Sequence, residues 1–496
     1  MGQFLNNKEP YDKYRTVKNG PYFVDKSEIL EELIPALQQE QRFFCITRPR
    51  RFGKTIMANM IAAFFENTEE ESLFDDLYIS RYKHYKEQVG RHDVIYIDFS
   101  EMPRGCRNYQ EYILRIQDGL IRDIEEAYPE LEIKSDAAVW DILSHVFDKT
   151  GDKFVFVMDE WDAVFHMSFI TERDRENFLL FLKLLLKGKS YVELAYMTGV
   201  LPIAKYSDGS ELNMFLEYNM ATRVRFSEYF GFSDEEVDKL YEKYLQNTKK
   251  PQIDREGLRE WYDGYHFGEC DVYCPWDVMN YLRDLQKNPE AKPVEYWRNT
   301  SDNAIIRSFI DYAGSSITGK LEVLLSGGYI VEPIEENLTY DYLHSSEENL
   351  WSVLYLTGYL TRVREQELKA CLPRGSVALV IPNEEVREIF AATIVRWFGE
   401  NARTWNRKAL FDAVWEGDTA VINEEMNRLL RKTISYHDYR EDYYHAFLAG
   451  IFAGAGYMVE SNREHGEGRS DIVISDSENG RVAIFEAKCS RTPEDM

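Results

Sequence analysis

The feature that most constrains the fold is a short apolar run followed by a loop that ends in Gly-Lys-Thr. The run is Phe43–Thr47, the loop is Arg48–Phe52, and the triplet is Gly53, Lys54 and Thr55. Apolar residues of the next segment recur at helical spacing and share one face: Ile56, Met60, Ala63 and Phe64. A strand, a glycine-containing loop and a helix in this order are typical of a phosphate-binding loop, because loop and helix amides point toward anionic oxygens.

In such a loop Gly53 allows close backbone approach, Lys54 reaches the β- and γ-phosphates, and Thr55 ligates Mg²⁺. We expect nucleotide-binding contacts from the triplet and from its neighbours Arg51, Phe52 and Ile56. The usual pattern starts with glycine, whereas this chain has Arg48 there. The alternative is therefore a helix start that reads Gly-Lys-Thr by chance. Three arginines either contact phosphate or offset acidic neighbours: Arg48, Arg50 and Arg51.

A second apolar run, Phe154–Met158, ends in an Asp-Glu pair. At the end of a buried strand, Asp159 can hold the Mg²⁺ shell and Glu160 can polarise an attacking water. A third run, Leu194–Met197, leads to Thr198, a candidate sensor of the γ-phosphate, although a strand-ending turn is equally ordinary. The motifs together predict binding of ATP or GTP.

Four continuous apolar runs separated by helical patterns indicate a parallel sheet buried on both faces: Phe43–Thr47, Val94–Phe99, Phe154–Met158 and Leu194–Met197. The fold class is therefore α/β. Later segments are read as a mainly helical stretch that begins with a capping box at Ser233 and Glu236, a mixed stretch with a helix from about Asn383, and a stretch that is helical to Tyr457.

The composition limits the partners. The chain has 496 residues, and 86 acidic against 59 basic side chains give a net charge of -27. An acidic chain lacks the non-specific electrostatic attraction to nucleic-acid phosphates that a basic protein has. Contact with nucleic acid therefore requires a local basic patch. Arginines that could supply one, or could simply be solvated, are Arg362, Arg364, Arg374, Arg387, Arg396, Arg403 and Arg407.

No apolar stretch is long enough to span a bilayer, because Phe178–Leu186 is short and contains Lys183. Six sparse cysteines fit a reducing compartment. Cys270 and Cys274 are half of a zinc pattern that no second pair completes. We therefore expect a cytoplasmic protein without membrane contact.

A second constellation lies near residue 480. Two predicted strands, Ser470–Ser475 and Arg481–Lys488, form a hairpin that carries Asp471, Glu486 and Lys488. Glu486 and Lys488 project from one face because side chains alternate along a strand. Two carboxylates and an ammonium group suit Mg²⁺-assisted phosphodiester hydrolysis, with Asp471 and Glu486 on the metal and Lys488 positioning or activating water. An ordinary charged hairpin is the alternative.

An upstream helix adds to this constellation. Glu441 opens the segment EDYYHAFLAGIF and could be a further metal ligand. His445 shares its face, and packing among aromatic neighbours explains it equally well.

These residues together resemble the bacterial AAA-ATPase-like proteins that carry a restriction-endonuclease-like, PD-(D/E)XK domain at the C-terminus. The strings that carry the resemblance extend over nearly the whole chain: Tyr22–Ser27, Arg48–Thr55, Tyr229–Val237, Tyr262–Phe267, Pro275-Trp276 and Leu356–Leu360.

The resemblance implies an AAA-type P-loop domain over residues 1–235, a helical lid over 236–330, a mixed α/β connecting region over 331–402 and a nuclease-like domain over 403–496. It implies that Asp159 and Glu160 form the Walker B pair, that Asp471, Glu486 and Lys488 form the nuclease triad, and that Glu441 is the helical glutamate of that site. Two departures stand out: Ser470 replaces the usual proline, and the sequence given ends eight residues after Lys488, so we expect an abbreviated or truncated nuclease module.

The leading hypothesis is an ATPase, with ATP and Mg²⁺ as cofactors, coupled to a metal-dependent nuclease-like module that acts on or binds DNA. The alternatives are a nucleotide-controlled switch whose nuclease-like domain is inactive and only binds, and a metabolic kinase. A homo-oligomer is compatible with the AAA-type module. Arg223 or Arg225 could complete a nucleotide site in cis or in trans.

Overall fold

The computed structural model describes residues 2–68, 70–133, 136–203, 212–220, 225–247, 255–297, 320–321, 323–334, 347–368, 372–373, 375–403, 408–433, 452, 457–465, 468–476 and 479–485. The chain divides into two compact units. One comprises Met1–Pro293 and Ile334–Gly358, and the other comprises Val294–Pro333 and Tyr359–Met496.

A five-stranded parallel sheet in the order β2-β3-β4-β1-β5 forms the centre of the first unit. Its strands are β1 Phe43–Thr47, β2 Asp93–Asp98, β3 Phe154–Asp159, β4 Val192–Gly199 and β5 Leu216–Tyr218. The first four match the predicted runs, and their parallel pairing confirms the expected α/β fold. Strand β5, which pairs with β1, is a short run that the sequence did not single out.

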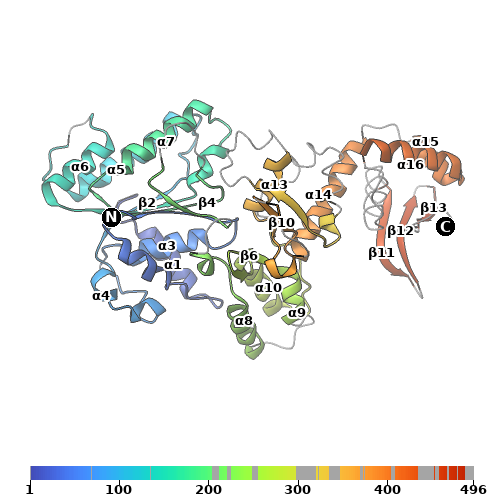
Figure 1. Ribbon diagram of the computed structural model, residues 1–496, viewed down its shortest axis with the longest axis horizontal. Coiled ribbons are helices and arrows are strands. Elements are labelled where there is room, and N and C mark those ends of the chain that lie inside the picture. The colour runs from blue at the N-terminus through green and yellow to red at the C-terminus, as the bar shows by residue number, and fades with distance from the viewer. Residues whose placement is uncertain are drawn as a thin grey trace. The chain divides into compact units, whose positions relative to one another are not determined.

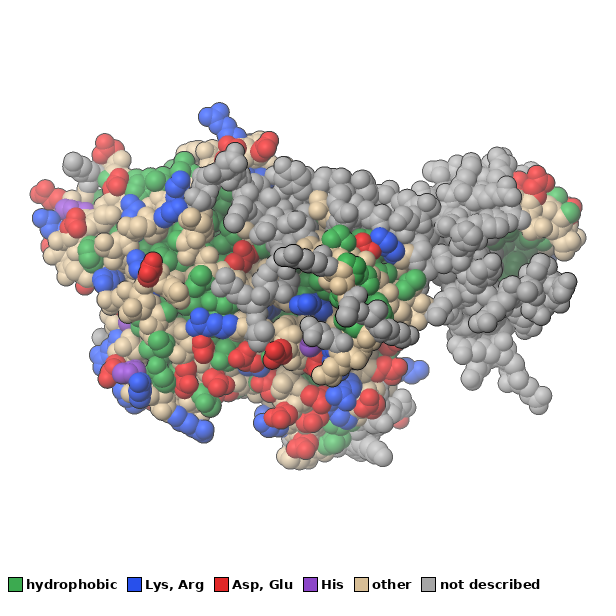
Figure 2. Space-filling view, viewed as in Figure 1, with side chains coloured by type: hydrophobic (Ala, Val, Ile, Leu, Met, Phe, Trp, Pro, Cys, Tyr) green, Lys and Arg blue, Asp and Glu red, His purple; other side chains and the backbone are tan. Residues whose placement is uncertain are grey.

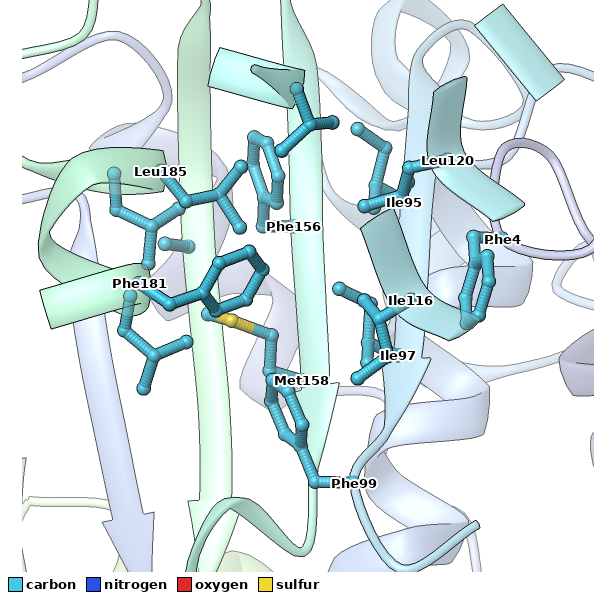
Figure 3. Packing of buried hydrophobic residues seen from close by; sticks show 14 of the residues in the cluster. Phe4, Ile95, Ile97, Phe99, Ile116, Leu120, Phe156, Met158, Phe181 and Leu185 are labelled. Atoms are coloured by element: carbon cyan, nitrogen blue, oxygen red, sulfur yellow. The ribbon is translucent and has the colours of Figure 1, made fainter. Parts of the chain in front are cut away.

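Helices cover both faces of this sheet (Figure 1). One face carries α5 Tyr109–Ala127, α6 Val139–Thr150 and α7 Glu172–Leu186; the other carries α1 Lys8–Lys18, α3 Lys54–Phe65 and α4 Tyr85–Gln88, with α2 at Ile29–Leu33. Figure 3 shows how Phe156 and Met158 of β3 meet Phe181 and Leu185 of α7 on the first face. Each inner strand is buried on both sides, which explains why its sequence is apolar throughout.

The N-terminal residues extend the sheet beyond β2. Leu5 forms an antiparallel bridge with Ile95, and the Tyr96 amide donates to the Phe4 carbonyl at 2.9 Å. The carboxylate of Asp123 accepts hydrogen bonds from the amides of Gln3, Phe4 and Leu5. These bonds cover an edge strand that would otherwise expose its backbone.

A helical region follows the sheet and packs in the same unit. It contains α8 Asp234–Asn247, α9 Arg255–Tyr262 and α10 Pro275–Lys287, together with a hairpin of β6 Tyr265–Phe267 and β7 Cys270–Val272. The capping box is confirmed: the Glu236 amide donates to Ser233 Oγ at 3.3 Å, and the Ser233 amide donates to Glu236 Oε2 at 2.8 Å. The hairpin interrupts the mainly helical stretch and was not predicted. Helix α13 Glu347–Leu356 completes the described part of this unit.

The second unit contains two small antiparallel sheets. The first has the order β8-β10-β9, with β8 Ile330–Pro333, β9 Thr361–Arg362 and β10 Ser376–Val380. The second has the order β11-β12-β13, with β11 Met458–His465, β12 Gly468–Asp476 and β13 Arg481–Phe485. Helices of this unit include α14 Glu384–Arg403, α15 Lys408–Glu416 and α16 Thr419–Thr433.

This unit confirms the helix after Asn383, whose side chain accepts from the Val386 amide at 3.1 Å, and the hairpin of β12 and β13. Strand β11 was missed. Its sequence, MVESNREH, lacks the apolar alternation of a half-buried strand, so only its pairing with β12 reveals it.

One residue of the predicted apolar helix face departs from expectation. Met60, Ala63 and Phe64 are buried, but Ile56 is 39% exposed. Ile56 lies in the first turn of α3, where it lines a cleft beside Gly53.

Among the described residues, no helix combines the length and apolarity that a membrane crossing requires. Figure 2 shows acidic and basic side chains interspersed on the described part of the viewed face.

A pH-dependent term in stability is expected from Glu66, which ends α3 and is only 2% exposed. Burial raises the pKa of its carboxyl from 4.5 to about 7. Between pH 4.5 and about pH 7, Glu66 is ionised in the unfolded chain but still protonated in the folded protein. The free energy of unfolding therefore falls as the pH rises through this range, and the whole loss is present above about pH 7. We compare the change in the free energy of unfolding that Glu66→Gln causes at pH 8 with the change that it causes at pH 4. We expect the change to be more stabilising at pH 8 by on the order of 3 kcal/mol.

Denaturant unfolding at the two pH values measures this difference. Glu40→Gln, at an exposed position, is the control and should show no such pH dependence. An equal effect of Glu66→Gln at both pH values would contradict the prediction.

Candidate nucleotide-binding site

The loop between β1 and α3 has the backbone of an anion-binding turn. Arg51 and Gly53 both have left-handed backbone conformations, with φ values of 75° and 86°. Gly53 is the N-cap of α3, so the helix N-terminus opens directly onto the loop. A side chain at Gly53 would meet no atom within 4 Å, so glycine is required there by backbone conformation rather than by space.

Lys54 is buried within this loop. Its ammonium group donates to the carbonyl oxygen of Pro49 at 3.0 Å. The same charge favours the ionised forms of both Asp159 and Glu160, which places Lys54 beside the acidic pair. The loop and the end of β3 therefore converge, as the sequence predicted.

Asp159 is the last residue of β3 and is fully buried. Its Oδ1 accepts a hydrogen bond from Thr198 Oγ1, and the Thr55 side chain also hydrogen-bonds to its carboxylate. Burial raises the pKa of this carboxyl, and the bonds from Thr198 and Thr55 oppose that rise. Thr198 lies on β4, next to β3, so adjacent strand ends assemble this group.

The donor set fits a magnesium ion. Asp159 Oδ2 is buried and has no hydrogen-bond partner among the described residues. An unsatisfied buried carboxylate oxygen is costly unless a ligand pairs with it. Together with the Thr55 hydroxyl it would supply the hard oxygen ligands that Mg²⁺ prefers.

Glu160 follows directly and turns away from the strand. Its φ of 50° is unusual for a residue other than glycine, and such conformations concentrate at functional sites. Burial raises the pKa of its carboxyl, and the charge of Lys54 is the largest opposing influence. A partly buried carboxylate at this place can accept a proton from, or orient, a water molecule.

Asp162 is a site residue that sequence reasoning missed. It is buried, and its carboxylate accepts from the amides of Val200, at 3.1 Å to Oδ2, and Leu201, at 2.9 Å. These bonds fix the chain just after β4. A Cβ atom at Gly199 would lie 2.3 Å from the Trp161 ring, so glycine is needed there for close packing. The signal was a second carboxylate two residues after the Asp-Glu pair.

The aromatic and basic residues of the loop face the helical region of the same unit. Phe52 is buried against Tyr265 and Phe267, with ring centroids 4.8 and 5.0 Å away. The Arg51 guanidinium lies 4.2 Å from the centroid of the Trp276 ring. Phe52 therefore anchors the loop by packing, a role that the motif alone did not indicate.

A largely apolar cleft adjoins the loop. It reaches Gly53 and is lined by residues of the segment before β1, of α3 and of the helical region: Tyr14, Val17, Tyr22, Phe23, Val24, Lys26, Phe52, Ile56, Met57, Met60, Tyr229, Gly231, Phe232, Pro275 and Met279. Lys26 is held at its edge by hydrogen bonds to Glu236 and to the Glu228 carbonyl, each of 2.8 Å. An apolar cleft beside an anion-binding turn suits a ligand with a flat ring and a charged tail.

Other predicted residues lie elsewhere or are not described. Arg225 forms an ion pair with Glu32 at 2.7 Å, and Arg223 lies outside the described residues. In the second constellation Asp471 lies on β12, and the residue after it, Ile472, pairs with Phe485 on β13. Glu441, Glu486 and Lys488 lie outside the described residues, so the triad stays a prediction.

Comparison with known families addresses both constellations. Residues 11–207 match the model of a family described as predicted AAA-ATPase, and residues 439–495 match that of the PD-(D/E)XK nuclease superfamily. These two segments are therefore similar to an AAA-ATPase-like domain and to a nuclease of the PD-(D/E)XK superfamily. Both parts of the resemblance found in the sequence are thereby confirmed, and the AAA-ATPase match contains the loop, the Asp-Glu pair and Thr198.

A curated relative of this chain is an uncharacterized protein in the vnfD 5′ region of Azotobacter chroococcum mcd 1. It is 24% identical over 485 residues, which cover 94% of this chain and 86% of the relative.

Among solved structures, the Walker-type ATPase PABY2304 of Pyrococcus abyssi has a TM-score of 0.39 at 14% identity and covers 74% of this chain and 94% of its own. Cdc6p of Pyrobaculum aerophilum has a TM-score of 0.32 at 12% identity, and the match covers 80% of this chain and 99% of Cdc6p.

The hydroxyl of Thr198 can be tested by an isosteric change. Thr198→Val removes one of two hydroxyl donors to Asp159, so we expect nucleotide affinity in the presence of Mg²⁺ to fall about tenfold, and affinity in EDTA to change little. Thr47→Val is the matched control, because Thr47 Oγ1 is buried at the end of the neighbouring strand and has no hydrogen-bond partner within the described ranges. Titration calorimetry measures both. A loss of equal size in EDTA, or in the control, would argue against a role through the metal.

Proposed function

We propose that this protein binds ATP with Mg²⁺ at the loop of residues 48–55 and hydrolyses it. The observation that carries the proposal is the convergence of a helix N-terminus, Lys54 and the buried Asp159, whose Oδ2 has no hydrogen-bond partner in the part of the chain that the structure describes. The amides and Lys54 would neutralise the phosphates, Thr55 and Asp159 would hold the metal, and Thr198 would orient Asp159. Bound Mg²⁺ supplies Lewis-acid stabilisation of the charge that develops on the phosphoryl oxygens.

Glu160 is the proposed base of the hydrolytic step. It orients a water molecule toward the γ-phosphorus and accepts its proton as the water oxygen bonds to that phosphorus and the bond to the bridging oxygen of the departing ADP breaks. Burial raises the pKa of this carboxyl, and the charge of Lys54 opposes that rise. A carboxylate with a raised pKa is a better acceptor for the proton of the attacking water.

The base of the nucleotide would occupy the apolar cleft beside Gly53. The described residues that line it are aromatic and aliphatic side chains and a lysine, and none of them is a carboxylate that could accept from the ring N–H and amino groups of guanine. The Glu236 carboxylate at its edge already accepts from Lys26. We therefore favour ATP over GTP.

The second part of the proposal concerns the C-terminal segment. Asp471, Glu486 and Lys488, with Glu441, would form a Mg²⁺-dependent site that cleaves or binds DNA, and ATP turnover would control it. The match of residues 439–495 to the nuclease superfamily and the pairing of β12 with β13 support this assignment. We also propose that the chain is divided into domains after residues 235, 330 and 402, and that it can assemble into a homo-oligomer.

Phosphate release tests the ATPase. Glu160→Gln should lower kcat at least 100-fold while ATP affinity changes less than threefold, because only the proton acceptor is removed. Glu101→Gln is the control, since Glu101 follows β2 and pairs with Arg115 on the surface. Absence of turnover in the wild-type protein with ATP bound would contradict hydrolysis and favour the nucleotide-controlled switch.

Cleavage of plasmid DNA in Mg²⁺ or Mn²⁺ tests the nuclease. Asp471→Asn should abolish metal-dependent nicking without changing ATP turnover. Asp476→Asn, on the same strand, is the control, because Asp476 accepts from Asn479 and Arg481 within the hairpin. If wild-type protein binds DNA without cutting it, the module acts in binding alone.

A further inference from the structure

Arg48 occupies the place where a phosphate-binding loop usually begins with glycine, and its side chain is fully buried. A buried guanidinium is rare unless its charge is compensated. The sequence offered two roles for it, contact with phosphate or neutralisation of acidic neighbours. Its observed hydrogen bonds to main-chain carbonyls indicate a third role.

The hydrogen bonds of Arg48 tie together the strand ends beside the loop. Its Nη1 donates to the carbonyl of Thr47 at 2.8 Å and to that of Tyr218 at 2.7 Å. Its own amide donates to the Gly199 carbonyl at 3.2 Å. Thr47, Tyr218 and Gly199 are the last residues of β1, β5 and β4. One residue therefore joins three strands where the loop leaves the sheet.

Two aromatic rings contact the same guanidinium. The Arg48 Cζ atom lies 5.3 Å from the ring centroid of Phe230 and 5.6 Å from that of Phe267. Phe267 ends β6 in the helical region, and Phe230 lies just before that region. Nε and Nη2 have no hydrogen-bond partner among the described residues. The ring faces and carbonyl dipoles therefore compensate the charge. Burial lowers the pKa of Arg48 to about 10, which leaves it protonated at neutral pH.

The β6–β7 hairpin contacts the loop at a second point. Phe52, four residues after Arg48, packs on Tyr265 and on Phe267, the ring that also faces Arg48. The hairpin thus touches the loop before and after the turn that would surround the phosphates. A change in the loop on either side of that turn alters a contact with the hairpin.

On the basis of the nucleotide binding proposed above, we propose that Arg48 is a positioning residue that couples the phosphate loop to the β6–β7 hairpin. When phosphates order the loop, Arg48 holds Phe267 and Phe230 in place, and the helical region becomes more rigid. Without Arg48 the loop can still bind phosphates through its amides and Lys54, but phosphate binding no longer makes the β6–β7 hairpin more rigid.

Hydrogen exchange on the full-length chain, with and without saturating Mg²⁺ and the non-hydrolysable analogue AMPPNP, tests the coupling. In the wild-type protein we expect AMPPNP to slow exchange about tenfold in two places, the loop and residues 265–272. In Arg48→Met, at a concentration that saturates the variant, the loop should still be protected, and the protection of residues 265–272 should be lost.

Arg42→Met is the matched control. Arg42 directly precedes the first residue of β1, at the end of the strand away from the loop. Its Nη1 donates to the Gln39 carbonyl at 2.8 Å, and its Cζ atom lies 5.1 Å from the centroid of the Phe43 ring. It has the same chemistry without contact to the hairpin residues, so its loss should leave the protection of residues 265–272 unchanged.

The outcomes separate this proposal from the one on which it rests. If wild-type protein does not bind AMPPNP, the proposed nucleotide site fails, and the coupling with it. If it binds AMPPNP but residues 265–272 gain no protection, or if Arg48→Met keeps that protection, the coupling alone is overturned.

A second variant decides the matter if Arg48→Met does not fold. Phe230→Leu keeps an apolar side chain and removes one ring from the guanidinium. We expect it to bind AMPPNP as the wild-type protein does and to lose at least half of the protection of residues 265–272. Unchanged protection in this variant would overturn the coupling.

Discussion

A buried carboxylate at the end of a parallel strand determines the site of this protein. Asp159 is excluded from solvent, and an ionised group in that position is costly unless hydrogen bonds and charge compensate it. Thr198, Thr55 and the charge of Lys54 provide part of the compensation, and Oδ2 is left for a ligand. Because the carboxyl ends of parallel strands meet at one edge of the sheet, a strand order with β1 beside β4 and β4 beside β3 brings these groups together.

The loop of residues 48–55 is held in place by contacts with the helical region as well as by the strands of the sheet. Arg48 and Phe52 place a guanidinium and a ring against aromatic residues of the helical region, so the loop is part of a packed interface within one compact unit. An interface of this kind can transmit a local change, because packed side chains do not deform continuously. A glycine at position 48 would provide neither the carbonyl bonds nor the ring contacts.

Much of this could be predicted from the sequence, because the informative residues are local. Continuous apolar runs gave the inner strands, and the Gly-Lys-Thr triplet and the Asp-Glu pair gave the loop and the acidic residues that it meets. Arg48 and Asp162 could not be assigned, since their partners are main-chain groups far away in sequence. Strand β11 was missed because it is polar. The exposure of Ile56 was not predicted because its surroundings include the segment before β1 and the helical region.

A crystal structure with Mg²⁺ and a non-hydrolysable ATP analogue tests the central claim most directly. The account predicts phosphates against the amides of residues 50–55, the metal about 2.1 Å from Thr55 Oγ1 with Asp159 in its coordination sphere, and adenine in the cleft beside Gly53. Phosphates bound away from Lys54, or a metal that neither Thr55 nor Asp159 approaches, would contradict it.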